Sequence, residues 1–131
     1  MSKDLGLNQF IWFYGECYDE NLLNSLLYNA DVCVSPGNVG LTAMHCMQYG
    51  VPVITHNNFE EQMPEYESIK DWKTGLLYEY GDFEDFKDKI RLWILSQDDR
   101  EAIRQNCYGV INMHYNSDYQ ISVIKQVIHK V

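Results

Sequence analysis

The stretch from Ser35 to Thr55 constrains the fold more than any other part of the chain. It follows the short apolar run Val32–Val34, which is typical of a buried strand, and the turn-forming sequence Pro-Gly-Asn ends that run. Apolar residues then recur at helical spacing up to Gly50, a residue type that commonly ends helices. A Val-Pro-Val-Ile-Thr run completes the stretch and favours a second strand. Two strands joined through a helix predict a parallel pair.

Strand and helix patterns alternate along most of the chain, so the predicted fold class is α/β. We expect a Rossmann-like parallel sheet with flanking helices and a helical C-terminus, in a single domain over residues 1–131. Ser117 and Gln120 form a capping box that should begin the last helix. The expected strands are Phe10–Tyr14, Val32–Val34, Val53–Thr55 and Thr74–Tyr80, and the expected helices are Asp19–Ala30, one from Val39 or Gly40 to Tyr49, Asp82–Leu95, Asp98–Tyr115 and Ser117–Ile128.

The loop before the short helix is the first candidate site. Gly37 and Gly40 carry no side chains where the free backbone N–H groups of a helix N-terminus point outward, and such groups favour an anion. A glycine before a helix more often serves only a turn. In a parallel sheet, ligands lie beyond the carboxyl ends of strands, where Gly15-Glu16 is also expected. The polar loop from His56 to Glu65 is long enough to be functional.

Composition excludes several kinds of partner. The formal charge is −9, with nineteen acidic against ten basic residues, which argues against nucleic acid and anionic membrane surfaces. No transmembrane span or signal peptide is visible, so we expect no membrane insertion. The four cysteines show no C-x-x-C spacing and predict reduced thiols in the cytoplasm. No pair of histidines has ligand spacing, so no metal is expected.

Several motifs in fixed order resemble one known family. They are Asn29-Ala30-Asp31 before a strand, Ser35-Pro36, Gly40-Leu41 opening a helix, Tyr49-Gly50-Val51-Pro52-Val53-Ile54, and Lys73-Thr74-Gly75-Leu76-Leu77. Together they resemble the donor-binding half of GT-B glycosyltransferases of the family 4 type, particularly enzymes of capsular-polysaccharide biosynthesis. The resemblance covers about Phe10 to Trp93. It implies a nucleotide-sugar substrate without a further cofactor, and a glycan or lipid-linked acceptor whose hydroxyl receives the sugar.

The family's two glutamates, which flank seven residues, are replaced here by Gly37 and His45. In the family the first contacts the donor sugar and the second contacts the ribose. A neutral imidazole both donates and accepts, so His45 could replace the second contact, although a helix histidine bordering the core is the simpler interpretation. No catalytic residue is identified. The implied donor-binding residues are Gly37, Asn38, Val39, Gly40, Leu41, Thr42 and His45, and the candidate donor-loop residues are Gly15, Glu16, His56, Glu65 and Glu67.

The resemblance also implies what else such an enzyme needs. A GT-B acceptor lobe and the opening strands of the donor lobe, which bring a basic pair for the diphosphate, would precede Met1, so the chain alone is expected to be inactive. With the strand order 3-2-1-4-5-6, Phe10–Tyr14 would lack its neighbours. It would then pair beside Val32–Ser35 or leave an open edge for self-association. A nucleotide-sugar epimerase of related architecture and a non-catalytic α/β module remain alternative functions.

Overall fold

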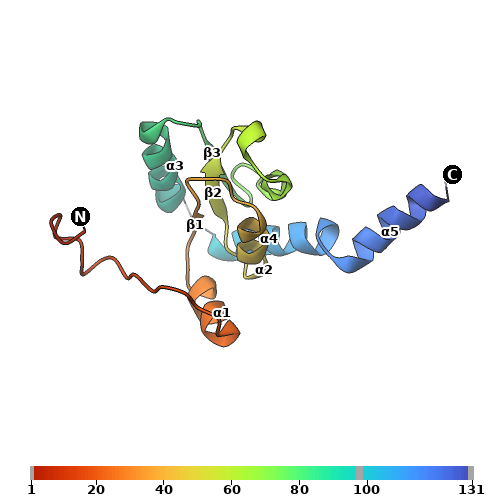
Figure 1. The fold of residues 1–131 in the computed structure, drawn as a ribbon, viewed down its shortest axis with the longest axis horizontal. Helices are drawn as coiled ribbons and strands as arrows, with labels where there is room; N and C mark the ends of the chain where they lie inside the picture. The colour runs from red at the N-terminus through yellow and green to blue at the C-terminus, as the bar shows by residue number, and fades with distance from the viewer. Residues whose placement is uncertain (1, 97–98, 130–131) are drawn as a thin grey trace.

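The computed structural model describes residues 2–96 and 99–129. The sheet consists of β1, β2 and β3, and two short 3₁₀ helices, η1 and η2, lie between β2 and β3 (Figure 1). In chain order the elements are α1 (Glu20–Tyr28), β1 (Cys33–Val34), α2 (Leu41–Gln48), β2 (Val53–His56), η1 (Phe59–Glu61), η2 (Pro64–Ser68), β3 (Gly75–Tyr78), α3 (Phe83–Ser96), α4 (Arg100–His114) and α5 (Ser117–Ile128).

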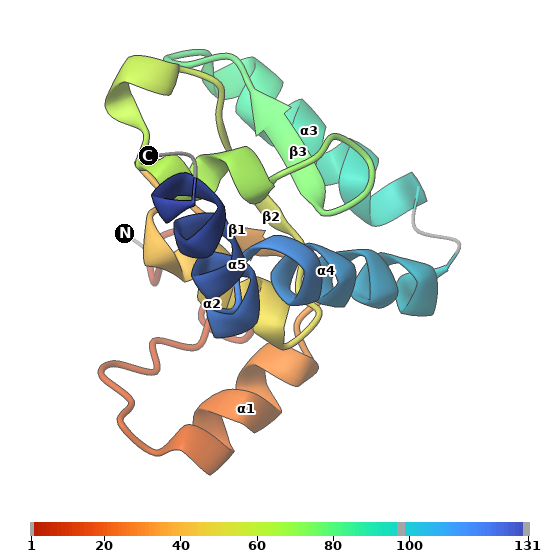
Figure 2. The ribbon, with the colours of Figure 1, turned by 90° about the vertical axis from the view of Figure 1, so that its right-hand side faces the viewer.

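The three strands run parallel in the order β1-β2-β3, which confirms the predicted α/β class in a small, partial Rossmann-like form. β2 is central and all four of its residues are buried. Its successive side chains enter different clusters: Val53 packs with α2 and α4, and Ile54 packs with Trp93 of α3. Helices therefore cover both faces of the sheet, as Figure 2 shows from the side.

Individual residues set the ends of several helices and strands. Asp19 caps α1, because one carboxylate oxygen accepts from the N–H groups of Asn21 and Leu22. Gly50 ends α2 with a φ of 72°, as its place in the sequence predicted. Gly75 begins β3 at a φ of 153°, where an added Cβ would lie 1.8 Å from the carbonyl oxygen of Val53. Only glycine permits this approach of β3 to β2.

The strand predicted at Phe10–Tyr14 is absent. Residues 2–18, which we call the arm, form no strand and run away from the sheet (Figure 1). Phe10, Trp12 and Phe13 remain 72–78% exposed. The prediction was wrong because β-favouring side chains make a strand only when another strand accepts their backbone hydrogen bonds, and none does so in the described residues.

The last helix, α5, covers the predicted residues but has a different cap from the predicted one. Asn116 has extended backbone geometry and its side chain accepts from the N–H of Tyr119, so it caps α5. The capping box of Ser117 and Gln120 was therefore wrong, because Ser117 is already inside the helix. The cap of α4 is Asp99; the predicted start at Asp98 lies outside the described residues.

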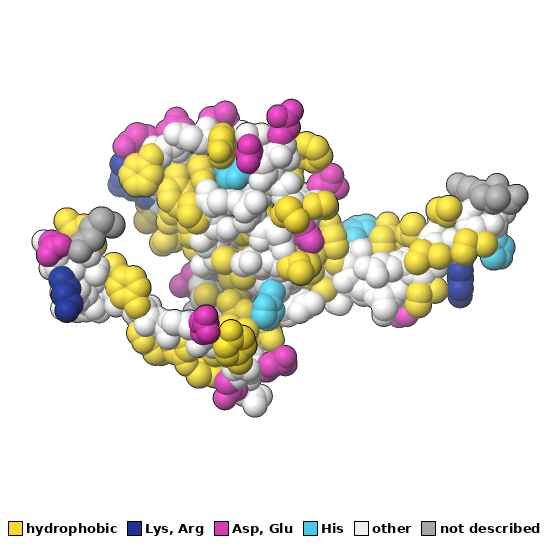
Figure 3. Space-filling view, viewed as in Figure 1, with side chains coloured by type: hydrophobic (Ala, Val, Ile, Leu, Met, Phe, Trp, Pro, Cys, Tyr) yellow, Lys and Arg dark blue, Asp and Glu magenta, His cyan; other side chains and the backbone are white. Residues whose placement is uncertain are grey.

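α5 projects from the rest of the molecule in Figure 1, and no residue of α5 is buried. Apolar side chains lie along this helix and along the arm in the space-filling view of Figure 3. Of the helices within the described ranges, none is both long and apolar enough to cross a bilayer.

Candidate functional site

The loop between β1 and α2 lies at the carboxyl edge of the sheet and is fixed by side chains from other segments. The hydroxyl of Thr55, at 3.0 Å, donates to the carbonyl oxygen of Gly37. The side-chain oxygen of Gln62 accepts from the N–H of Val39 at 2.9 Å. Gly37 and Asn38 are exposed on this framework. The backbone of the loop is thus held in one conformation while its surface stays accessible.

Gln62 links the loop to β2 with both ends of its amide. While its oxygen accepts from Val39, its nitrogen donates to the hydroxyl of Thr55 at 2.9 Å and to the carbonyl oxygen of His56 at 3.0 Å. Sequence reasoning missed Gln62 and Thr55. The only signal for Gln62 was its place in the long polar loop after β2, where several other polar residues looked equally suitable.

Val39 differs from the other candidate residues of the loop. Its side chain is 3% exposed and packs in the core cluster with α2 and α4, and its N–H is occupied by Gln62. Neither group is available to a ligand. Val39 therefore anchors the loop, and the accessible candidates are its neighbours.

The first turn of α2 has no side-chain cap, because the N-cap residue is Gly40. The N-terminal amides of α2, at Leu41 and Thr42, therefore receive no N-cap side chain. His45 lies one turn further along the same exposed face and, with Leu41 and Thr42, lines a hollow of about 420 Å³. Its ring centroid lies 5.4 Å from that of Tyr49. The structure thus brings together uncapped amides and an exposed imidazole.

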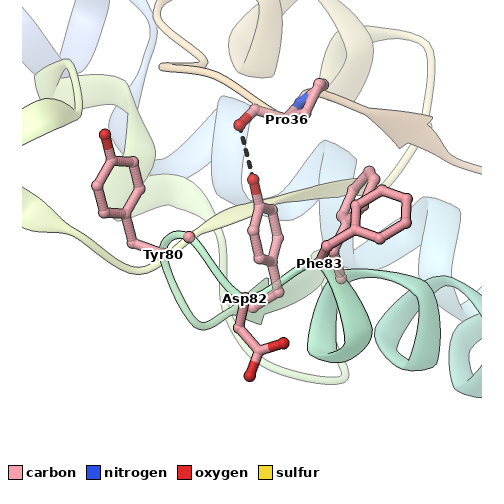
Figure 4. Close-up of a pocket in the computed structure, with 7 residues that line it drawn as sticks. Pro36, Tyr80, Asp82 and Phe83 are labelled. Atoms are coloured by element: carbon pink, nitrogen blue, oxygen red, sulfur yellow. Dashed lines mark hydrogen bonds between the residues drawn. The ribbon is translucent and has the colours of Figure 1, made fainter.

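A second hollow, of about 470 Å³, opens where β3 ends (Figure 4). Pro36 and Tyr78 line it, and the hydroxyl of Tyr78 donates to the carbonyl oxygen of Pro36 at 2.6 Å. Tyr80 and Phe83 lie on its walls and are largely exposed. This aromatic hollow was not predicted, because aromatic residues at helical spacing within 82–95 are typical of the core-facing stripe of a helix.

Glu65 and Glu67 belong to η2 and line a third hollow, of about 500 Å³, which also includes Leu41 and Tyr115. One carboxylate oxygen of Glu65 is buried without a hydrogen-bond partner. Burial raises the pKa of the Tyr115 hydroxyl, and the charges of Glu67 and Glu65 raise it further. Both glutamates thus lie beside the start of α2, and both remain candidate donor-loop residues.

His56 does not face a ligand site. It is 2% exposed, and its ring lies against Tyr78 and Tyr80, with centroids 6.2 and 4.7 Å away. Burial lowers the pKa of this imidazole, although the charge of Glu61 opposes the shift. Its Nδ1 accepts from the N–H of Asn58. His56 is a neutral core residue beneath the loop.

Gly15 and Glu16 are not brought to the carboxyl edge, because the strand that should have carried them there is missing. They lie in the arm, where the carboxylate of Glu16 accepts from the Tyr18 hydroxyl at 3.2 Å. An added Cβ at Gly15 would meet nothing within 4 Å. The candidate loop from the arm therefore does not form in this chain.

The hollows beside the loop are lined by no lysine or arginine in the described residues. Arg100 donates to the carbonyl oxygens of Tyr28 and Ala30 and pairs with Asp31 at 3.2 Å. Arg104 donates to Tyr28 as well, with its guanidinium 3.9 Å from the centre of that ring. Both arginines hold the C-terminal end of α1 and do not contribute charge to the loop.

The cysteines and metal-binding residue types point to no chemistry of their own. All four cysteines are free thiols, and burial raises the pKa of Cys107 to about 12, which disfavours the nucleophilic thiolate. Within 2–96 and 99–129, no three His, Cys, Asp or Glu side chains gather as a metal would require. Independence from metal stays a prediction.

Comparison with known proteins identifies the class. Residues 1–110 match the family of glycosyl transferases group 1, and the chain belongs to that family. This supports a role in glycosyl transfer in general. No curated protein and no solved structure matches the chain.

Proposed function

We propose that this chain carries the donor-binding part of a GT-B glycosyltransferase of the family 4 type, and that Gly37, Asn38, Gly40, Leu41, Thr42 and His45 bind a nucleotide-sugar. Val39 anchors the loop from the core. The observation that carries the proposal is the loop held by Thr55 and Gln62, which presents the uncapped first turn of α2 beside the exposed His45. Uncapped amides at a helix N-terminus suit a diphosphate, and a neutral imidazole suits ribose hydroxyls.

The remaining contacts follow from the same arrangement. Gly37 has no side chain for the donor sugar, so that contact falls to the exposed Asn38 and to Glu65 or Glu67 across the third hollow. Carboxylates only accept hydrogen bonds, which suits sugar hydroxyls. The acceptor in this proposal is a glycan or lipid-linked hydroxyl in polysaccharide biosynthesis in the cytoplasm. Membership of the group 1 family favours transfer over the epimerase and non-catalytic alternatives.

Titration with nucleoside diphosphates, followed by backbone amide NMR, tests the donor site. UDP, GDP and ADP are each tested, because the proposal does not specify the base of the nucleotide. At least one should shift the amides of Gly37 and of residues 40–42 more than any amide of α3, α4 or α5. If the largest shifts fall in those helices, the loop does not bind the donor.

Two variants make the titration specific. Gln62→Ala should weaken nucleotide binding because it frees the loop, whereas Gln105→Ala, which removes an exposed glutamine bonded to Glu101, should leave it unchanged. His45→Ala should erase the preference for a ribonucleotide over its 2′,3′-dideoxy analogue, a difference of about 0.5–1.5 kcal/mol for one neutral hydrogen bond. Equal discrimination by wild type and His45→Ala would remove His45 from the site.

We further propose that the chain alone binds donor weakly and transfers no sugar. No lysine or arginine lines the hollows beside the loop in the described residues, and two missing charge-assisted hydrogen bonds would cost about 3–6 kcal/mol. Positioning of an acceptor and stabilisation of the leaving diphosphate are the larger catalytic contributions. A radiolabelled nucleotide-sugar assay tests this. Turnover that Asn38→Ala and His45→Ala abolish would contradict it.

A further inference from the structure

β1 has one edge without a partner strand in the described part of the chain. The N–H groups of Cys33 and Ser35 donate to carbonyl oxygens on the β2 side, each at 2.9 Å. Because backbone groups in a strand alternate in direction, those of Val34 point to the open side. Val34 is also 36% exposed. An unpaired edge of this kind is a template for another strand.

The arm supplies a segment with the chemistry of a strand. Residues 10–14 read Phe-Ile-Trp-Phe-Tyr, with strong β propensity, no charge and no proline. Phe10 and Phe13 are 76% and 78% exposed, and the ring centroid of Trp12 lies 4.7 Å from that of Tyr14, within the same segment. Such a concentration of exposed aromatic surface marks an interaction site.

The chain does not close this edge with its own arm. The arm leaves the N-terminal end of α1 and runs away from β1 (Figure 1). The other end of α1 is held to α4 by Arg100 and Arg104, which both donate to the carbonyl oxygen of Tyr28. α1 is thus fixed at its C-terminal end. The arm stays apart from β1, and the edge of β1 has no partner strand in the described residues.

We propose that Phe10–Tyr14 of one copy pairs with the free edge of β1 in a second copy, in a reciprocal exchange of arms. Exchanging an identical element between copies is a low-cost route to a symmetric dimer. Each aromatic ring offers on the order of 150 Å². With three exposed rings in each arm, two exchanged arms and the surfaces they cover would together bury about 1,800 Å², the size of a standard stable interface. Neither strand segment carries a charge that would oppose the contact.

The test is the oligomeric state of the full chain by light scattering and sedimentation, from micromolar to submillimolar concentration. The wild type should dimerise. The triple variant Phe10→Ser, Trp12→Ser and Phe13→Ser should weaken dimerisation about 100-fold or more, since buried aromatic anchors dominate interface energy. These side chains are exposed in the monomer, so circular dichroism should show an unchanged fold.

Two further variants make the result specific. Val34→Pro removes the outward N–H without breaking a hydrogen bond to β2, and it should also give a monomer. The matched control Ile124→Ser, Val127→Ser and Ile128→Ser removes similarly exposed apolar side chains from α5 and should leave the dimer intact.

Hydrogen exchange supplies the second measurement. In the dimer, the amides of residues 10–14 and of Val34 should become protected, and the triple variant should lose the protection at Val34. A monomeric wild type overturns the proposal, including one whose own arm is protected. A dimer that survives Val34→Pro and the triple variant, or that the α5 control dissociates, overturns it as well.

Discussion

The central unit and the peripheral segments carry similar apolar patterns but very different packing. The central unit, which comprises β1–β3, α2–α4 and the segments that connect them, contains all the buried residues of both core clusters. α1 and α5 also have apolar residues at helical spacing, yet neither contains a buried residue. α2 is no more apolar in appearance, but four of its eight residues are buried. An apolar stripe therefore shows what a helix can bury, and the sheet decides what it does bury.

The central unit and the peripheral segments pack differently because they have different neighbouring elements. β2 is covered on both faces, so side chains on either face of this strand are removed from water. Within the described residues, the arm and α5 pack against no sheet, and many of their apolar side chains stay exposed. The loop between β1 and α2 belongs to the packed unit, because Thr55 and Gln62 connect it directly to β2. Destabilising substitutions in the central unit should consequently disturb the candidate site, whereas substitutions in the peripheral segments should not.

Gly75→Ala should produce the largest effect. The new Cβ would lie 1.8 Å from the carbonyl oxygen of Val53, in a backbone conformation that L side chains rarely adopt. We expect a loss of more than about 4 kcal/mol, which is enough to unfold a small domain. Chemical denaturation checks this. Gly15→Ala, at a positive φ in the open arm, is the matched control and should change the free energy of unfolding by less than about 0.5 kcal/mol.

A pair of tryptophans tests the same contrast without backbone strain. Trp93 is 1% exposed and packs with Ile54 and Leu76, so Trp93→Ala should cost about 3–5 kcal/mol. Trp12 is 72% exposed, so Trp12→Ala should cost less than about 0.5 kcal/mol in the monomer. Urea titration of both variants below the dimer range measures the difference. Equal losses would mean that the arm is packed in solution.

The sequence predicted the central unit better than the peripheral segments, because local patterns do not report whether a packing partner is present. β2, β3 and α2 were recognisable because glycines with local roles mark the boundaries of their apolar runs: Gly50 ends α2 before β2, and Gly75 begins β3. Phe10–Tyr14 was misassigned because strand formation depends on a neighbour, which no local pattern reports.

The candidate site shows the same limit. Gly40 and His45 could be proposed from their positions in the motif. The structure places Gly40 at the N-cap of α2 and His45 one turn further along, on the exposed side of the helix. Gln62 could not be found, because it fixes the loop through a hydrogen bond to Val39, which is 23 residues away in the sequence. His56 looked like a loop residue and is buried, since β2 continues one residue further than its apolar run.

Arg104→Met should loosen the junction between centre and periphery. The change removes the hydrogen bond to Tyr28 and the contact with its ring, but it also removes a buried guanidinium with one unpartnered nitrogen. These effects oppose each other, so we expect a net change within about 1–2 kcal/mol. Hydrogen exchange should show faster exchange in α1 and unchanged protection in β2. Arg91→Met, an exposed change on α3, is the control; slower exchange in α1 would contradict the role of Arg104.

The smallest expected effect is a pH dependence that comes from the buried His56. Burial lowers the pKa of its imidazole below the ordinary value of 6.5, so the unfolded chain binds this proton more readily than the folded one. Stability should therefore fall as the pH drops below about 6.5, until His56 is protonated in the folded state as well, and should be flat above it. His56→Asn should reduce the slope of unfolding free energy against pH in this window, whatever its effect on stability at neutral pH. Gln48→Asn, which changes an exposed residue of α2 that does not titrate, should leave the slope as it is in the wild type. Denaturant titrations at several pH values between the carboxylate range and neutrality measure the slope. A slope that His56→Asn leaves unchanged would mean that the buried imidazole is not its source.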